Sequence, residues 1–295
     1  MEKGWEYYAG KLFSKLLCLL PYNILLWLGR GCGSLYYRLA GSLRERAKKQ
    51  MMQGLLISEE ETRPIIKRLF TNLAMNALEF LYLPNLSKDN IYEYVEIEGL
   101  QHLDQALQKG KGAIFLTAHF GNWELFGVTL PMLGYPAVGI GKQQPKAGIT
   151  ALLTEYRTMY GGDFYYKGAA VRHVMRALKD NKVLYMLADQ DGGKEGIFIE
   201  FLNKPASTPP GAAAFARRCG AAVIPAFIRR DGHKHLITID PPLVLQETED
   251  AEVDIHNNLV TITKRVEDQI RKHPAEWLWF QKRWNTPMEV REKDE

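Results

Sequence analysis

The sequence predicts an α/β fold, with a central, mostly parallel or mixed sheet flanked by helices and a helical N-terminal segment before it. Two observations lead to this prediction. Residues 1–90 carry mainly helical patterns, whereas from Tyr94 onward short β-rich runs alternate with helical runs. Such alternation is typical of strands joined by helices that cover the sheet. We expect a helical region over residues 1–90, an α/β domain over 91–287 and a tail over 288–295.

The expected elements follow the hydrophobic pattern along the chain. Ser58-x-x-Glu61 forms a capping box ahead of a helix whose apolar positions run from Ile65 to Leu83, where Pro84 ends it. Short apolar runs predict strands over residues 94–97, 113–117, 136–140, 183–188, 198–202, 222–228 and 235–239. Helical periodicity between them predicts helices over residues 100–108, 123–133, 149–160, 170–180, 210–219 and 253–273.

The composition describes a folded globular chain. Of its 295 residues 46% are hydrophobic, and 38 Lys and Arg against 34 Asp and Glu give a net charge of +4. A disordered chain would have fewer apolar residues, and a dedicated nucleic-acid binder would be more basic, so we expect no nucleic-acid partner. The three cysteines, Cys18, Cys32 and Cys219, form no Cys-x-x-Cys pair, which argues against a disulfide scaffold or a zinc knuckle and favours a reducing compartment.

The N-terminal segment has the features of a membrane-associating region. Residues 1–50 hold nine Lys and Arg against three Glu, and the apolar run from Leu16 to Gly29 lies between Lys15 and Arg30. This run has 14 residues and contains Pro21, whereas a membrane-spanning helix needs about 20. An interfacial or re-entrant segment fits better than a full span, with cations and aromatic rings at the headgroup level. The alternative is a buried core helix with a solvated basic end.

A histidine and a glutamate stand where a buried strand gives way to a helix. His119 follows the strand that ends at Thr117, and Glu124 falls in the first turn of the next helix. Gly121 between them can bend the backbone, so that the carboxylate can orient the imidazole. The spacing alone is weak evidence, because about one of seven histidines meets an acid five positions later by chance. The second case, His235 and Asp240, lies on a strand that points the two side chains to opposite faces.

The alternative for His119 and Glu124 is a packed histidine beside a helix cap. A second polar cluster, Asp189-Gln190-Asp191, follows the strand that ends at Ala188, where it can bind ligand hydroxyls, anchor an arginine or form a plain polar turn. The chain has neither a Gly-x-Ser-x-Gly nucleophile elbow nor a His-Glu-x-x-His zinc motif, and Gly134–Lys142 is not a phosphate loop. A histidine base without a protein nucleophile predicts direct transfer to a hydroxyl or to water.

Taken together, these motifs resemble the bacterial lipid A biosynthesis (lauroyl/myristoyl) acyltransferase family of the lysophospholipid acyltransferase superfamily. The first motif is His119-Phe-Gly-Asn-Trp-Glu124, which matches the family's His-x-x-x-x-acid pattern. Further matching segments, in the family's order, are residues 183–191, 196–201, 206–211, 216–225 and the C-terminal signature 273–284.

The resemblance implies transfer of a fatty acyl chain from an acyl carrier protein thioester to a hydroxyl of a lipid A precursor, at the cytoplasmic face of the inner membrane. His119 would be the general base and Glu124 its orienting partner. The substrate-binding residues would be Asn122, Trp123, Arg157, Arg172, Asp189, Gln190 and Asp191. No cofactor and no metal would be needed. The partners would be acyl-acyl carrier protein, a lipid or glycolipid acceptor and the membrane surface.

Three other functions fit the same residues. The acceptor can be another membrane glycolipid, since the family also acylates mannosylated phosphatidylinositol. The chain can be a non-catalytic lipid-binding protein of the same fold. It can also be a thioesterase in which water replaces the acceptor hydroxyl.

Overall fold

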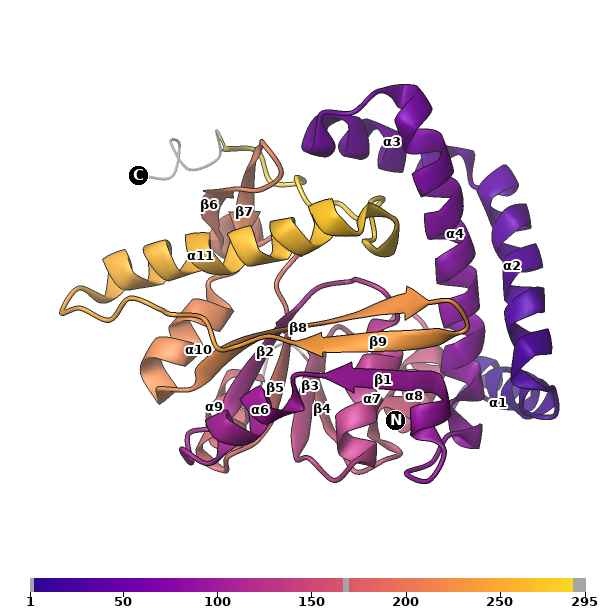
Figure 1. Ribbon diagram of the computed structural model, residues 1–295, viewed down its shortest axis with the longest axis horizontal. Helices are drawn as coiled ribbons and strands as arrows, with labels where there is room; N and C mark the ends of the chain where they lie inside the picture. The colour runs from indigo at the N-terminus through magenta and orange to yellow at the C-terminus, as the bar shows by residue number, and fades with distance from the viewer. Residues whose placement is uncertain (1–2, 167–169, 289–295) are drawn as a thin grey trace.

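The structure, a computed structural model, describes residues 3–166 and 170–288. Seven strands form one sheet in the order β1-β9-β8-β2-β5-β3-β4 (Figure 1). These strands are β1 (Val95–Glu98), β2 (Ala113–Thr117), β3 (Ala137–Gly141), β4 (Asp163–Tyr166), β5 (Val183–Leu187), β8 (Ala222–Asp231) and β9 (Lys234–Ile239). Neighbouring strands run parallel except in the antiparallel β8–β9 hairpin. The predicted mixed, mostly parallel sheet is therefore confirmed.

Helices cover both faces of this sheet. The connecting helices are α5 (Ile91–Tyr94), α6 (Leu100–Leu107), α7 (Trp123–Met132), α8 (Ala147–Thr158), α9 (Ala170–Lys179), α10 (Gly211–Cys219) and α11 (Ala251–Lys272). In Figure 1, α11 lies above the sheet and α6 and α7 lie below it. Strand β2 is buried along its whole length, and its side chains alternate between two hydrophobic cores, with Leu116 in one and Phe115 in the other. A strand buried on both faces is what a near-continuous apolar run predicts.

Two strands were not expected from the sequence pattern. Strand β4 has no apolar alternation, and β7 (Pro205–Thr208) begins with a proline. Strand β7 pairs only with β6 (Ile197–Glu200), in a separate antiparallel ribbon. The expected strand over residues 198–202 thus belongs to this ribbon and not to the main sheet.

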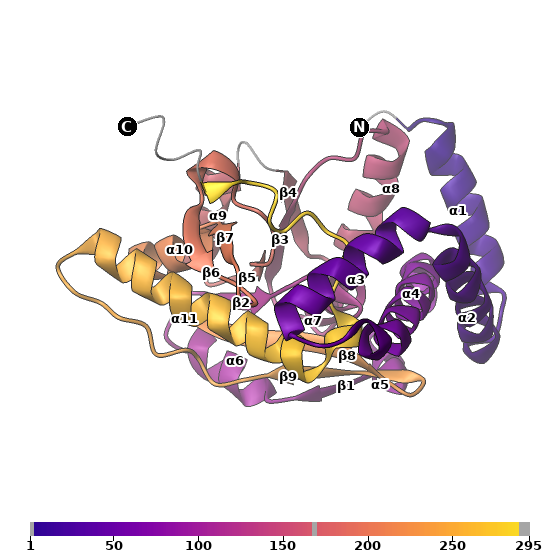
Figure 2. The same cartoon turned by 90° about the horizontal axis from the view of Figure 1, so that it is seen from above.

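The N-terminal region is helical, as predicted. Its helices are α1 (Trp5–Cys18), α2 (Tyr22–Leu39), α3 (Gly41–Leu55) and α4 (Glu59–Tyr82), and they gather with α8 at one end of the sheet (Figure 2). Pro21 separates α1 from α2, so the apolar run Leu16–Gly29 is not one helix. The predicted capping box forms at the start of α4, where Ser58 and Glu61 bond each other's backbone N–H groups.

Glycines let α2 lie close against α4. A Cβ atom on Gly33 would lie 2.5 Å from the Cα atom of Thr71, and one on Gly29 would lie 2.9 Å from the Cα atom of Met75. Larger residues at these positions would push the two helices apart. Across residues 3–166 and 170–288, no helix is both long and apolar enough to cross a membrane. The predicted tail, apart from Met288, lies outside the described residues.

Candidate active site

The candidate site lies at the carboxyl ends of two neighbouring parallel strands. Thr117, the last residue of β2, pairs in register with Leu187, the last residue of β5. The residues that follow, His119 on one strand and Asp189 on the other, therefore emerge side by side. This edge of a parallel sheet is where ligands bind in α/β folds.

His119 and Asp189 form a hydrogen-bonded pair. The ring Nδ1 of His119 lies 2.9 Å from Oδ1 of Asp189, and the backbone N–H of His119 donates to Oδ2 at 3.0 Å. Because an ionised carboxylate only accepts hydrogen bonds, Nδ1 carries the ring proton. The other ring nitrogen, Nε2, then carries the lone pair and accepts a long hydrogen bond from the side-chain amide of Gln190 at 3.4 Å.

Burial and charge set the titration of this pair. Burial alone favours a neutral Asp189, but the imidazole of His119 and hydrogen bonds from Gln281 and Trp277 hold the pKa of Asp189 well below its usual range. Burial also opposes protonation of His119, but the charge and hydrogen bond of Asp189, followed by the charge of Glu124, raise the pKa of His119 above its ordinary value. The imidazole is therefore a stronger base than a free histidine.

The carboxylate that hydrogen-bonds the ring of His119 is that of Asp189, whereas the sequence motif suggested Glu124. Glu124 accepts two hydrogen bonds from Arg157 of α8, from Nε at 2.8 Å and from Nη2 at 2.5 Å, and a third from the indole N–H of Trp123 at 3.2 Å. Glu124 lies in the first turn of α7, which directs its carboxylate toward α8 instead of toward Nδ1 of His119. Burial tends to lower the pKa of Arg157, but the bond and charge of Glu124 outweigh this and raise it.

A buried polar cluster centred on Glu79 of α4 holds the loop from His119 to Asn122. We call this the Glu79 cluster, and it consists of Tyr22, Asn76, Glu79, Asn122, Arg230 and His235. The carboxylate of Glu79 accepts hydrogen bonds from Asn122 at 2.8 Å, from Tyr22 at 2.6 Å and from Arg230 at 2.6 and 3.0 Å. Asn76 adds a bond to the carbonyl oxygen of Gly121 at 2.8 Å.

His235 completes the Glu79 cluster as a neutral donor. Its Nε2 lies 3.1 Å from both carboxylate oxygens of Glu79. Burial, and the charge of Arg230 to a smaller extent, lower the pKa of His235 despite the opposing charge of Glu79. Asp240 instead pairs with Arg265, so the structure separates His235 from Asp240 as the strand geometry predicts.

Gly121 lets the loop turn against the sheet. Its φ of +56° is in the left-handed region, and a Cβ atom there would lie 1.9 Å from the carbonyl oxygen of Ile228. A side chain would therefore clash with β8 as well as strain the backbone. The bend that the sequence predicted at this glycine is confirmed, but Glu124 bonds Arg157, and the ring of His119 bonds Asp189.

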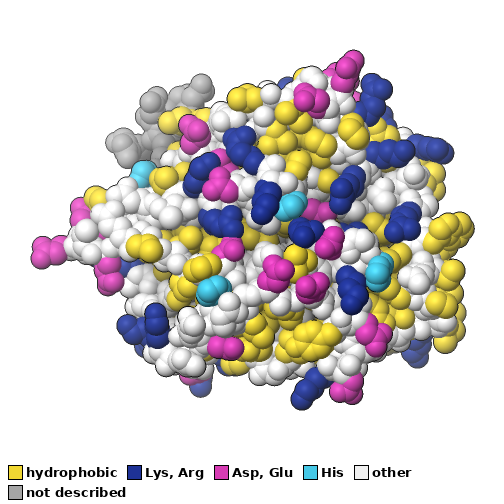
Figure 3. Space-filling model, viewed as in Figure 1, with side chains coloured by type: hydrophobic (Ala, Val, Ile, Leu, Met, Phe, Trp, Pro, Cys, Tyr) yellow, Lys and Arg dark blue, Asp and Glu magenta, His cyan; other side chains and the backbone are white. Residues whose placement is uncertain are grey.

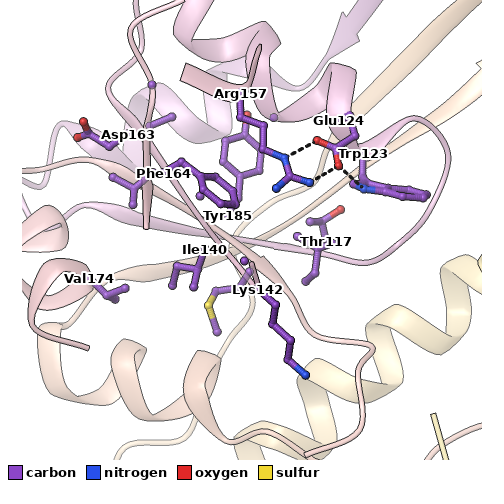
Figure 4. A pocket seen from close by; sticks show the side chains of 18 of the residues that line it. Thr117, Trp123, Glu124, Ile140, Lys142, Arg157, Asp163, Phe164, Val174 and Tyr185 are labelled. Carbon is purple, nitrogen blue, oxygen red and sulfur yellow. Dashed lines mark hydrogen bonds and ion pairs between the residues drawn. The ribbon is translucent and has the colours of Figure 1, made fainter. Parts of the chain in front are cut away.

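A cavity of about 500 Å³ opens beside the pair. His119, Trp123, Glu124, Arg157 and Gln190 contribute polar groups to its lining. Most of the remaining wall is apolar or glycine, drawn from α7, α9 and strands β3 to β5; Figure 4 shows Ile140, Phe164, Val174 and Tyr185 around it. The ring of Phe164 lies under the guanidinium of Arg157, 4.7 Å from centroid to carbon.

Four predicted substrate-binding residues, Asn122, Arg172, Asp189 and Asp191, lie outside the lining of this cavity, and Asp189 instead accepts hydrogen bonds from His119. Asn122 is buried, where its amide donates to Glu79 and its carbonyl oxygen caps α7 by accepting from the backbone N–H of Leu125 at 3.1 Å. Asp191 accepts hydrogen bonds from the backbone and hydroxyl of Thr286. Arg172 is exposed on α9. The structure therefore gives Asn122 and Asp191 contacts within the protein.

The C-terminal segment supplies contacts to Asp189 and to the His119 loop that the sequence patterns did not identify. The indole N–H of Trp277 and the side-chain amide of Gln281 donate to Oδ2 of Asp189 at 2.7 and 2.8 Å. The backbone N–H of Leu278 donates to the carbonyl oxygen of His119 at 3.1 Å, and Gly121 donates to the carbonyl oxygen of Glu276 at 2.9 Å. The signature 273–284 marked this segment as part of the motif set, but no spacing could show that it contacts Asp189.

Comparisons with known proteins match this chain to one family. The family of bacterial lipid A biosynthesis acyltransferases matches residues 1–286. A lipid A biosynthesis acyltransferase of Haemophilus influenzae is 22% identical over 280 residues, which cover 94% of this chain and 86% of that protein. The lipid A biosynthesis lauroyltransferase of Escherichia coli is 25% identical over 96% of this chain and 92% of its own. A phosphatidylinositol mannoside acyltransferase of Mycobacterium tuberculosis is 24% identical over 70% and 66%.

Replacing Glu79 with leucine should destabilise the fold strongly. The variant leaves the buried guanidinium of Arg230 without its carboxylate, a loss that typically costs about 3–5 kcal/mol. Although burial opposes ionisation, His235 and Arg230 lower the pKa of Glu79, so its contribution is fully present above the unfolded value of 4.5 and declines as pH falls below it. Denaturant unfolding at pH 7 and pH 4 should therefore show a smaller difference from wild type at the lower pH.

The matched control is Glu60→Leu, on the exposed side of the same helix. It should cost at most about 1 kcal/mol, through the lost interaction with the helix N-terminus. Equal losses in the two variants would contradict the role of the Glu79 cluster.

Proposed function

Because the chain belongs to the bacterial lipid A biosynthesis acyltransferase family, we propose that it transfers a fatty acyl chain from an acyl carrier protein thioester to a hydroxyl of a lipid A precursor. The observation that carries the proposal is the pair of His119 and buried Asp189 beside a mostly apolar cavity. An imidazole with one nitrogen held by a carboxylate and the other left to accept a proton is suited to general-base catalysis.

In this mechanism Nε2 of His119 removes the proton from the acceptor hydroxyl. The alkoxide oxygen attacks the thioester carbonyl carbon, and the resulting tetrahedral oxyanion collapses to break the carbon–sulfur bond. The imidazolium, stabilised by Asp189, returns the proton to the departing thiolate. General-base catalysis of this kind contributes a factor of roughly 10² to 10⁴.

We propose that Glu124 and Arg157, which both line the cavity, face the reacting groups of the substrate. Glu124 uses both carboxylate oxygens to fix the guanidinium of Arg157, which leaves Nη1 of Arg157 as the donor not bonded to Glu124. A guanidinium held in place beside the imidazole can stabilise a developing oxyanion or a substrate phosphate. Glu124 would then act through Arg157, while Trp123 and Gln190 contact the substrate from the cavity wall.

The apolar part of the cavity is the proposed site of the acyl chain. Glu124, Gly127 and Pro131 line it from one face of α7, so the cavity extends about 10 Å along that helix. Gly127 has no heavy atom within 4 Å of where its Cβ atom would lie. This glycine therefore leaves space that a side chain would fill.

The proposed location is the cytoplasmic face of the inner membrane, with α1 and α2 at the lipid surface. Part of the apolar run packs inside, as Leu17 and Leu25 do, but Leu19 and Trp27 are 79% and 67% exposed. Hydrophobic side chains gather at the edge of the molecule where these helices lie (Figure 3). Exposed cations on the same helices, Lys15, Arg30 and Arg38, suit anionic headgroups.

A second acceptor class has support from the comparisons. The identity to the phosphatidylinositol mannoside acyltransferase is close to that of the lipid A enzymes, at 24% against 22–25%. Radiolabelled transfer assays that offer a lipid A precursor and a mannosylated phosphatidylinositol side by side would separate the two. Each assay should compare an acyl carrier protein donor with the coenzyme A thioester and should record free fatty acid, the product of a thioesterase.

Replacing His119 with alanine should abolish transfer without unfolding the protein. The variant removes the base, and we expect the rate to fall by a factor of at least about 10². His256→Ala, which changes an exposed histidine on α11, should retain wild-type activity. Transfer by the His119 variant at a wild-type rate would rule out the base and favour a non-catalytic lipid-binding protein.

Replacing Gly127 with leucine should shift the donor preference to shorter acyl chains. The side chain enters the cavity, so activity with a palmitoyl donor should fall at least about tenfold more than activity with a lauroyl donor. Leucine is a better helix former than glycine, so α7 should not be weakened. Gly31→Leu, at another open glycine in a helix, is the control and should leave the preference unchanged. Parallel losses for both donors would show that Gly127 does not face the acyl chain.

Replacing Leu19 and Trp27 together with glutamate should weaken binding to vesicles that contain anionic lipid. The substitutions place charges where the surface would enter the headgroup region. Sedimentation with vesicles, at low and at 0.5 M salt, measures the loss and its electrostatic part. Val244→Glu, which changes a residue that is 94% exposed on the loop before α11, is the control. Undiminished binding by the double variant would overturn the assignment of this surface.

A further inference from the structure

The carboxylate of Asp189 accepts four hydrogen bonds, although it does not reach solvent. His119 supplies two of them, from its ring and its backbone N–H. The other two come to Oδ2 from the C-terminal segment, from the indole of Trp277 at 2.7 Å and the amide of Gln281 at 2.8 Å. The proposed reaction uses only the ring contact, so the donors on Oδ2 require a separate explanation.

A buried carboxylate beside an imidazole has two opposing effects on a general base. It strengthens the base, which helps proton transfer, but it also favours the imidazolium, which can no longer accept a proton. Neutral N–H groups that donate to the same carboxylate stabilise its negative charge and so weaken its effect on the imidazole. The number of such donors therefore affects the fraction of the histidine that is unprotonated near neutral pH.

We propose that Gln281 is a positioning residue that acts through Asp189. Its amide fixes Oδ2 and moderates the basicity of His119, so the C-terminal segment sets the pH at which the enzyme becomes active. The kinetic test of this inference rests on the proposed function. The effect of Gln281 on the pKa of the His119 ring can be tested without it.

Other charged groups around the pair contribute from different elements. Glu124 of α7 favours the protonated ring and Arg157 of α8 disfavours it. Asp189 and Asp191 both act on Arg283 through their charges, and Arg283 is buried with its guanidinium bonded to the carbonyl oxygen of Ser207 and the hydroxyl of Thr208. All of these charges stay in place when Gln281 is changed, so a shift in the titration can be assigned to the lost donor.

Gln281 is a better test position than Trp277. Trp277 is fully buried and stacks edge-on against Trp279, so its replacement would disturb the core. Gln281 is half-buried, and methionine matches its length and shape without donating a hydrogen bond. The carboxylate would keep three of its four donors in the Gln281→Met variant.

The test is the pH profile of kcat/KM for acyl transfer. The acid limb of Gln281→Met should move to higher pH, by on the order of half a pH unit. Asp189→Asn should move the same limb to lower pH, because it removes the charge itself. The matched control is Gln50→Met, since Gln50 of α3 donates to the backbone carbonyl of Gln281 at 3.1 Å and holds the same segment without contacting Asp189. Its acid limb should stay at the wild-type position.

The proposal would be overturned if the acid limb of Gln281→Met stayed at the wild-type pH or moved to lower pH. An equal shift of the limb in Gln50→Met would overturn it as well. NMR titration of the His119 ring gives the same comparison without turnover. If the wild-type protein transferred no acyl chain, the proposed function would fail while the ring titration still decided the role of Gln281.

Discussion

The hydrogen bond from His119 to Asp189 depends on burying a carboxylate that never reaches water. An isolated buried charge would be very unfavourable, and here four N–H donors, one of them on the imidazole of His119, compensate for the lost solvent. The donors come from the end of β2 and from the C-terminal segment, which are more than 150 residues apart in the chain. The geometry of the base is therefore a property of the whole fold and not of one short motif.

Two buried polar clusters fix the motif loop from opposite sides. The Glu79 cluster holds Asn122 and Gly121 through α4, and the C-terminal segment holds His119 and Gly121 through backbone hydrogen bonds. Glu276 connects the two, because its side chain accepts from Asn72 of α4 at 2.9 Å while its carbonyl oxygen accepts from Gly121. A loop restrained in this way keeps the imidazole oriented, which is the preorganisation that the proposed general-base catalysis needs.

The sequence predicted the sheet well, because its central strands are continuous apolar runs with clear ends. It failed at β4 and β7, whose residues lack the alternation or carry a proline, and whose pairing depends on neighbours far along the chain. In the site, the position of His119 after a buried strand was informative, and Asp189 was identified as a polar residue at the end of another strand. The pairing of these two could not be predicted, because it depends on β2 and β5 being adjacent. The short spacing between His119 and Glu124 suggested that these two side chains form a pair, but Glu124 hydrogen-bonds Arg157 instead.

The central claim is that Asp189, and not Glu124, controls the protonation of His119. NMR titration of the His119 ring in wild type, Asp189→Asn and Glu124→Gln tests this most directly. Our account predicts that the pKa of His119 falls in both variants and falls much further in Asp189→Asn, since Asp189 contributes both charge and a hydrogen bond to the ring. A larger fall in Glu124→Gln than in Asp189→Asn would contradict it.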